Sequence, residues 1–341
     1  MSEEILPPER AKHIQVPTYD EILERVGKRI NVKRKGSKLD RELSRLQALR
    51  DIVISKTDFI RDLVRLLDSL HPFYWSLIEI EFDREELRDA IKCVSKARKM
   101  TDRLAEKYRI LLLASESPRE LNTVAREARG RILSLYKRCS RGLALLRSLV
   151  TFIQRLPGID ASSPTIIVAG PPSSGKSTFV SNVSRARLKV AEYPFTTKEI
   201  HVGHLTLGNI KVQVIDTPGI LDRDLEEMNQ IERKAAAALS KLPGAVLYLF
   251  DASSNAYMSL ERQEKLLVNT VAKLVLQKKV YVAVNKADIT RPERLEEAIR
   301  IAERAARKIG GEVIGPIVAA SKDNSLRVAE LIAKKEFVIN E

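Results

Sequence analysis

A glycine-rich turn that ends in a lysine and two hydroxyl residues occupies positions 170–178. Its members are Gly170, Pro171, Pro172, Ser173, Ser174, Gly175, Lys176, Ser177 and Thr178. An apolar run precedes it and helical residues follow, so this Gly-x4-Gly-Lys-Ser spacing predicts a phosphate-binding P-loop. Lys176 would reach the β- and γ-phosphates of a nucleotide, and the Ser177 hydroxyl would bind Mg²⁺. The alternative is an ordinary strand–helix turn with a solvated lysine.

A second turn follows a later apolar run. Its members are Asp216, Thr217, Pro218 and Gly219. The Asp216 carboxylate could hold Mg²⁺ through water, and the Gly219 amide could contact the γ-phosphate. Taken alone this is a common turn. Because Asp216 lies 40 positions after Lys176, at the end of an expected strand, it predicts a second part of the same nucleotide site.

A third group of polar residues, Asn285, Lys286 and Asp288, follows another apolar run. The Asp288 carboxylate can accept hydrogen bonds from both N1 and the exocyclic N2 of guanine, a donor pair that adenine lacks. Asn285 can tie this loop to the P-loop, and the stem of Lys286 can lie over the base. Backbone amides of Ala320 and Ser321 would complete the base pocket. Together the three groups predict a site for GTP or GDP with Mg²⁺ as the cofactor.

The apolar runs that precede these groups are short and continuous, as in buried parallel strands. They lie at residues 165–169, 212–215, 245–250, 280–284 and 313–318. Helical segments between most of them predict a doubly wound sheet with ligands at the carboxyl ends of its strands. Residues 1–160 instead carry apolar residues at steps of three and four. The sequence thus predicts an α+β two-domain chain, an N-terminal antiparallel helical bundle (1–160) followed by a mostly parallel α/β domain (161–341).

The chain is strongly basic, with a net charge of +14 and a pI of about 9.7. Residues 1–163 hold 33 Lys and Arg against 24 Asp and Glu, so the excess is larger there than in the remainder. This bias predicts a polyanionic partner, first of all nucleic acid, against the alternative of a merely soluble basic surface. Apolar stretches stay short of the ~20 residues of a membrane helix, and we expect neither a signal peptide nor stable membrane association.

A basic stretch in the first domain carries much of this excess. Its members are Arg25, Lys28, Arg29, Lys33, Arg34, Lys35, Lys38, Arg41, Arg45, Arg50, Lys56, Arg61 and Arg65. Lys38, Arg41 and Arg45 step by three and four, so we expect them to share a helix face beside the basic connector 33–35. Such a face predicts RNA binding that weakens steeply with added salt. The alternative is a solvated helix face.

The chain has only two cysteines, Cys93 and Cys139, without the spacing of metal ligands. Two cysteines do not support a disulfide framework, and a reducing cytoplasm is the expected location. Because Cys139 falls on the apolar stripe of an expected helix, we expect it to be a small buried side chain.

In this order, the three groups of site residues resemble the translation-factor-like class of GTPases. One segment, of the type seen in switch I of the Obg group, narrows the resemblance: Glu192, Tyr193, Pro194, Phe195, Thr196 and Thr197. Residues 71–74, 202–204 and 216–222 further resemble the Nog family of nucleolar G-proteins, in a short archaeal-type form. The resemblance covers roughly residues 15–335.

This resemblance implies a P-loop GTPase domain and a ribosome-biogenesis function on the precursor of the large ribosomal subunit, docking on rRNA. It also implies roles for single residues. Lys176, Thr197 and Gly219 would be catalytic, and Ser177, Thr197 and Asp216 would be the metal ligands, with Thr196 as second choice for Thr197.

Two positions modify the expected activity. Ile220 stands where Ras-like enzymes carry a water-orienting glutamine, so we expect slow intrinsic turnover. Ser173 replaces the asparagine usual in Obg-like P-loops, which leaves potassium activation open. We expect a monomer away from the ribosome. The alternatives are a nucleotide-gated RNA- or protein-binding module with negligible turnover, an ATP-using P-loop kinase, and a membrane-surface GTPase.

Overall fold

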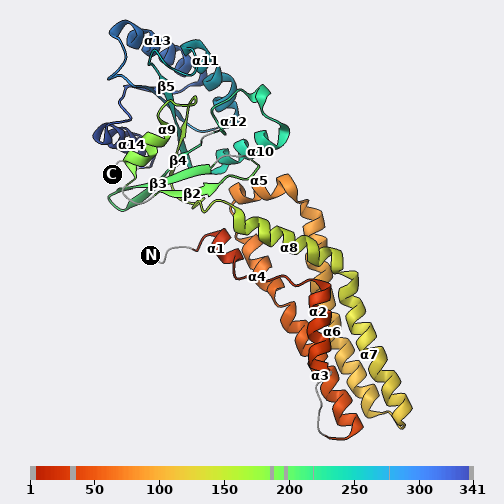
Figure 1. The fold of residues 1–341 in the computed structure, drawn as a ribbon. Helices are drawn as coiled ribbons and strands as arrows, with labels where there is room; N and C mark the ends of the chain where they lie inside the picture. Colours follow the sequence, from red (N-terminus) through yellow and green to blue (C-terminus); the bar gives the residue numbers. More distant parts are fainter. Residues whose placement is uncertain are drawn as a thin grey trace. The chain divides into compact units, whose positions relative to one another are not determined.

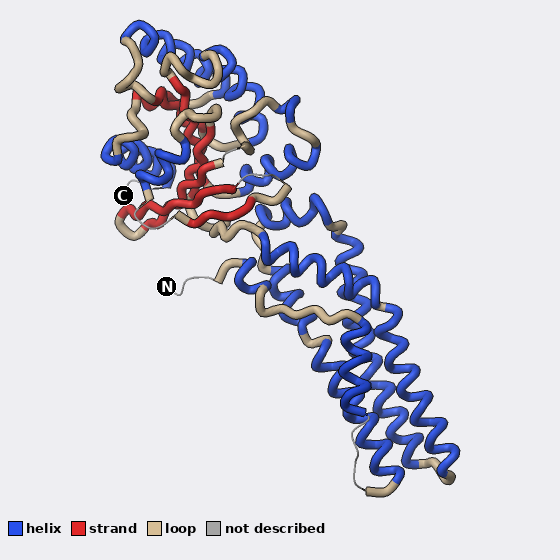
Figure 2. Tube along the Cα trace, viewed as in Figure 1, coloured by secondary structure: helices blue, strands red, loops and turns tan. Residues whose placement is uncertain are grey.

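The computed structural model of the protein describes residues 5–30, 36–184, 188–195, 199–217, 219–275 and 277–337. These form two compact units. The helical unit comprises the described residues up to Leu70 and Glu81–Gln154, and the α/β unit comprises His71–Ile80 and the described residues from Arg155 onward. Strands occur only in the α/β unit (Figures 1 and 2). The predicted α+β fold, a helical bundle followed by a mostly parallel α/β domain, is confirmed, whereas the boundary at residue 160 stays a prediction.

Long antiparallel helices build the helical unit (Figure 2). They are α1 (Pro7–Ala11), α2 (Tyr19–Ile30), α3 (Lys38–Lys56), α4 (Phe59–Asp68), α6 (Arg84–Leu113), α7 (Pro118–Arg138) and α8 (Ser140–Arg155). Side chains that accept hydrogen bonds from first-turn amides determine where several begin. Ser37 and Asp40 form a capping box at α3, and Asp83 accepts from two amides at the start of α6.

Side chains at steps of three and four form the core of the helical unit. Along α6 the buried positions are Leu87, Ala90, Val94, Ala97, Thr101, Ala105, Tyr108 and Leu112. The Thr101 and Tyr136 hydroxyls lie 3.1 Å apart within this core, so both polar groups are satisfied there. The helical periodicity of the sequence therefore predicted the buried face of α6.

Cys93 and Cys139 are joined in a disulfide, so the expectation of no disulfide is wrong. Cys93 lies on α6 and Cys139 is the C-cap of α7, and their Cα atoms are 5.8 Å apart. The antiparallel packing of α6 and α7 brings together two residues 46 positions apart, which their spacing along the chain does not reveal. Cys139 is buried, as predicted. Closing a loop of this length stabilises the folded chain by about 4 kcal/mol in the chain-entropy description.

A mostly parallel sheet organises the α/β unit. Its strands are β1 (Thr165–Ala169), β2 (Lys189–Glu192), β3 (Glu199–Leu207), β4 (Ile210–Asp216), β5 (Gly244–Asp251), β6 (Val280–Asn285) and β7 (Glu312–Pro316). Their order is β2-β3-β4-β1-β5-β6-β7. The parallel strands β4, β1, β5, β6 and β7 correspond to the five apolar runs. β2 and β3 pair antiparallel at one edge, and the sequence analysis did not predict them.

Helices cover both faces of this sheet (Figure 1), which confirms the doubly wound arrangement. On one face, α9 (Lys176–Val183) and α14 (Lys322–Phe337) pack on a core that includes Phe179, Leu247 and Ile332. The other face carries α10 (Gln230–Ala238), α11 (Leu260–Leu266), α12 (Ala272–Leu274) and α13 (Pro292–Ile309). Because the central strands are parallel, their carboxyl ends meet at one edge, where the predicted site residues follow.

The segment between helices α4 and α6 belongs to the α/β unit. Its helix α5 (Pro72–Glu81) buries Tyr74, whose hydroxyl donates to the carbonyl oxygens of Pro157 (3.0 Å) and Ile159 (2.5 Å). Burial raises the pKa of Tyr74 well above its ordinary value, which keeps the hydroxyl a proton donor. The backbone after Ile159 is in turn tied to β4, because Gln213 exchanges two hydrogen bonds with Asp160.

Candidate nucleotide-binding site

The predicted P-loop joins the end of β1 to the start of α9 in a conformation that requires glycine. Gly170 and Gly175 have φ angles of 144° and 98°. A Cβ on Gly170 would lie 2.6 Å from the carbonyl oxygen of Leu249, so no side chain fits there. Ser173 also has a positive φ of 61°. The first-turn amides of a helix have no partner within the helix, so α9 presents donors to an anion in this loop.

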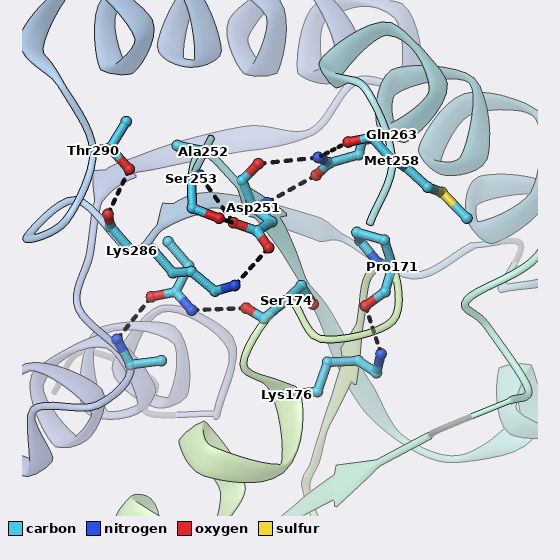
Figure 3. Close-up of polar contacts among 12 residues, drawn as sticks. Pro171, Ser174, Lys176, Asp251, Ala252, Ser253, Met258, Gln263, Lys286 and Thr290 are labelled. Atoms are coloured by element: carbon cyan, nitrogen blue, oxygen red, sulfur yellow. Dashed lines mark hydrogen bonds and ion pairs between the residues drawn. The ribbon is translucent and has the colours of Figure 1, made fainter. Parts of the chain in front are cut away.

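Lys176 is buried against the P-loop, which contradicts the alternative of a solvated lysine. The residue is 5% exposed, and Nζ donates to the carbonyl oxygens of Gly170 and Pro171, both at 2.9 Å. Figure 3 shows the contact with Pro171. Burial lowers the pKa of Lys176, although the carboxylates of Asp222 and Asp216 act in the opposite direction. A phosphate bound beside the ammonium would give it a full negative charge as partner, which its two carbonyl partners do not carry.

Ser177 and Asp216 come together as candidate ligands of Mg²⁺. The Ser177 hydroxyl donates to Asp216 Oδ2, and Oδ1 of the same fully buried carboxylate has no hydrogen-bond partner among the described residues. Hard oxygen donors of this kind suit Mg²⁺. The described residues hold no cluster of three or more His, Cys, Asp or Glu arranged for a metal. Mg²⁺ bound with a nucleotide usually takes phosphate oxygens and waters as its other ligands. Thr196 and Thr197 lie outside the described residues.

His201 is a neighbour of this carboxylate that the sequence analysis missed. It pairs with Asp216 across the antiparallel strands β3 and β4, and its Nδ1 lies 3.4 Å from Asp216 Oδ2. Its position beside Asp216 depends on the pairing of β3 with β4, which no local sequence motif predicts.

The turn after β4 places Gly219 beside Lys176. Thr217 is fully buried and donates to the Val168 carbonyl oxygen at 2.9 Å, which holds the turn against β1. Gly219 has a φ of 71°, and its amide donates to Asp222 Oδ2 at 2.8 Å. Ile220 is 2% exposed. Pro218 lies outside the described residues.

Asn285 connects the predicted guanine loop to the P-loop. Its Nδ2 donates to the Ser174 carbonyl oxygen at 2.7 Å, and its Oδ1 accepts from the Ala319 amide at 2.8 Å. One buried side chain therefore holds the P-loop and the loop after β7 in contact.

The other residues of the guanine loop are arranged around Asn285. Lys286 has a φ of 66°, and its ammonium points to Asp251 at the end of β5, with 2.6 Å between Nζ and Oδ2 (Figure 3). The sequence analysis missed Asp251. Asp288 and Ala320 are exposed, and the Ser321 amide donates to the Val318 carbonyl oxygen at 3.0 Å.

A hollow of about 670 Å³ lies in front of the P-loop. Its lining includes Pro172, Ser173, Lys176, Ser177, Thr178, Gly219, Asp222, Arg223 and Arg262. Asp288 does not line it, so the structure gathers the predicted phosphate-binding groups in one place and holds the base loop next to them through Asn285.

Two families match most of the chain. Residues 12–160 match the family described as NOG1 N-terminal helical domain, and residues 165–286 match the one described as 50S ribosome-binding GTPase. Nucleolar GTP-binding protein 1 of Drosophila melanogaster is 40% identical over 69% of this chain and 36% of its own length. The protein of the same name from Saccharomyces cerevisiae is 32% identical over 79% of this chain and 41% of its own.

The chain thus spans about two fifths of the length of these curated relatives. Among solved structures, a nucleolar GTP-binding protein 1 from Plasmodium falciparum covers 52% of this chain and 89% of its own, at 27% identity and a TM-score of 0.45.

The comparisons contradict the expected cytoplasmic location, because these relatives are named as nucleolar proteins. The expectation relied on a low cysteine count, which does not distinguish cytoplasm from nucleus. No helix among the described residues is both long and apolar enough to cross a bilayer.

Proposed function

This chain belongs to the family of nucleolar GTP-binding protein 1, and on that basis we propose that it is a slow GTP-hydrolysing switch acting on the precursor of the large ribosomal subunit. The match of residues 165–286 to a 50S ribosome-binding GTPase family supports the choice of subunit. The observation that carries the proposal is the meeting of Lys176, Gly219 and the Ser177–Asp216 pair around one hollow.

Each of these groups has a defined task in phosphoryl transfer. Lys176 would bind the β- and γ-phosphates, and the Gly219 amide would donate to the γ-phosphate. Ser177 and Asp216, with Thr197, would hold Mg²⁺, which neutralises charge on the phosphates when bound. The P-loop amides would hold the remaining phosphate oxygens, and Asp288 would select guanine.

The side chain directly after Gly219 cannot orient an attacking water. Ile220 is apolar and buried, so it cannot form the hydrogen bond that a glutamine supplies in Ras-like enzymes. We therefore propose low intrinsic turnover and activation by the ribosomal particle. Ser173 leaves potassium activation as a separate question.

Single-turnover hydrolysis tests this proposal. We expect slow cleavage of GTP by the chain alone and an acceleration on the order of tenfold or more with large ribosomal subunits, because a partner can supply missing transition-state contacts. Small subunits at the same concentration are the control for non-specific RNA. Tight GTP binding without cleavage in any of these mixtures would support the nucleotide-gated binding module instead.

The helical unit arranges its basic stretch differently from the predicted face. Residues 33–35 lie outside the described residues. Lys38 donates to the Pro118 carbonyl oxygen at 3.1 Å, Arg41 to that of Gly36 at 3.4 Å, and Arg45 pairs with Glu42 at 2.5 Å. These three cations therefore have partners within the chain, and two of those partners are backbone carbonyl oxygens.

A different group of cations lines a hollow of about 1170 Å³ between α2, α3 and α6. The group comprises Arg25, Arg29, Arg50, Lys56 and Arg109. Arg50 pairs with Asp102 and Arg109 with Glu106, each at 2.8 Å. Arg25, Arg29 and Lys56 are exposed. Exposed ion pairs contribute little stability and can be exchanged for phosphate contacts. We propose that rRNA docks here.

Charge reversal in the hollow should weaken RNA binding strongly. We expect Arg25→Glu/Arg29→Glu/Lys56→Glu to lower the affinity of the full chain for rRNA on the order of a hundredfold and to flatten its salt dependence, measured by filter binding. The control is Arg61→Glu/Arg65→Glu/Lys92→Glu, which changes the charge equally at exposed positions outside the hollow. An equal loss in both variants, or a salt-independent wild type, would refute docking at this hollow.

A further inference from the structure

Asp222 faces the two groups that the proposed function assigns to the γ-phosphate. One oxygen of its carboxylate, Oδ2, accepts from the Gly219 amide at 2.8 Å and lies 3.8 Å from Lys176 Nζ. The side chain is 11% exposed and lines the hollow in front of the P-loop. A buried carboxylate needs a hydrogen-bond donor or a cation as partner, and here both partners belong to the candidate nucleotide site.

We infer that the Asp222 carboxylate competes with the γ-phosphate for the Gly219 amide, and that it sets the preference between GTP and GDP. This inference rests on the proposed function, because it assumes that Lys176 and Gly219 bind the γ-phosphate. The γ-phosphate cannot accept from the Gly219 amide while Asp222 Oδ2 does, and it would share the Lys176 ammonium with a competing negative charge. GTP must displace the carboxylate, whereas GDP can bind with it in place.

The displacement disfavours GTP for two reasons. Asp222 loses a hydrogen bond and an ion pair in a site that is largely shielded from water, where such contacts are stronger than at the surface. A carboxylate that stays near the γ-phosphate also repels it, since both groups are negative. Arg223 and Arg262 line the same hollow and could receive a displaced carboxylate.

A purely structural interpretation makes a different prediction. In it, Asp222 only closes the turn 219–222, remains bonded to Gly219 in every nucleotide state and does not face the γ-phosphate. Loss of its charge would then change GTP and GDP binding alike, or neither of them.

Measuring the affinities of Asp222→Asn for GTP and for GDP distinguishes the two interpretations. Asparagine keeps the size of the side chain and an oxygen that can accept from Gly219, but it removes the charge. We expect the full-length variant to bind a non-hydrolysable GTP analogue about tenfold more tightly than wild type, with GDP affinity changed less than about twofold. Asp222→Ala should shift the GTP-to-GDP affinity ratio in the same direction if the asparagine variant does not fold.

Asp224→Asn is the matched control, because it removes the same charge two positions later, where the carboxylate lies 3.6 Å from Arg262. An unchanged ratio for Asp222→Asn, a loss of affinity for both nucleotides, or an equal gain in the Asp224→Asn control would overturn the inference. Failure of the wild-type chain to bind either nucleotide would instead overturn the proposed function.

Discussion

Replacing Asp288 with asparagine is expected to lower GDP affinity roughly a hundredfold or more, ~2.8 kcal/mol, and to create binding of xanthosine diphosphate. In the proposed site the carboxylate accepts two hydrogen bonds from N1 and N2 of guanine. An amide presents a donor in place of one acceptor, so guanine loses a contact and leaves a polar group unpaired. Xanthine has a carbonyl at position 2, which restores the match.

The surroundings of Asp288 in the structure allow the effect of Asp288→Asn to be interpreted as a change in base recognition. Asp288 is exposed, whereas the neighbouring Asn285 is buried and holds the loop to Ser174 and Ala319. The substitution should therefore alter base selection without disturbing the loop. Titration of GDP and xanthosine diphosphate measures the effect, with Glu293→Gln, at another exposed carboxylate nearby, as the control. Unchanged GDP affinity would remove Asp288 from the base site.

Features with a local signal could be predicted from the sequence. The P-loop depends on residues that are neighbours in the chain, and its glycines take the positive φ angles that the motif requires. The buried stripe of α6 follows from a period of three to four residues, and the contact between Asn285 and Ser174 follows from two motifs at the carboxyl ends of parallel strands.

Features that depend on packing between distant segments could not be predicted. The disulfide needs the antiparallel alignment of α6 with α7, and the place of His201 needs the register of β3 on β4. Asp251 contacts the predicted guanine loop only because β5 and β6 end side by side, so that its carboxylate accepts from the Lys286 ammonium. The role inferred for Asp222 depends on the side chains it faces, since the residue itself is an unremarkable acid in a turn.

Replacing Lys176 with alanine is expected to lower GTP affinity roughly a hundredfold or more, ~2.8 kcal/mol. The ammonium is the buried positive charge closest to the proposed phosphate site, and no other described lysine contacts the P-loop carbonyl oxygens of Gly170 and Pro171. Without this ammonium, no described lysine would contact the phosphates, and the loop amides and Mg²⁺ would have to bind them. Isothermal titration with GTP and Mg²⁺ measures the loss.

The variant should nevertheless stay folded. Burial lowers the pKa of Lys176, so the folded chain holds this proton less tightly than the unfolded chain does. At a pH where both states carry the proton, the charge therefore opposes folding, and its removal offsets the loss of two hydrogen bonds to carbonyl oxygens. We expect the thermal midpoint of the nucleotide-free chain to move by less than about 4 °C.

Lys278 provides a matched control for this argument. It is also partly buried in the α/β unit, donates to the carbonyl oxygens of Leu242 and Gly244, and has a pKa that burial lowers to about 8. It lies at the opposite end of the sheet from the P-loop, just before β6 begins. Lys278→Ala should therefore remove a comparable lysine and leave GTP affinity unchanged. Equal losses of GTP affinity in the two variants, or unfolding of Lys176→Ala alone, would mean that Lys176 supports the structure of the loop and not the nucleotide.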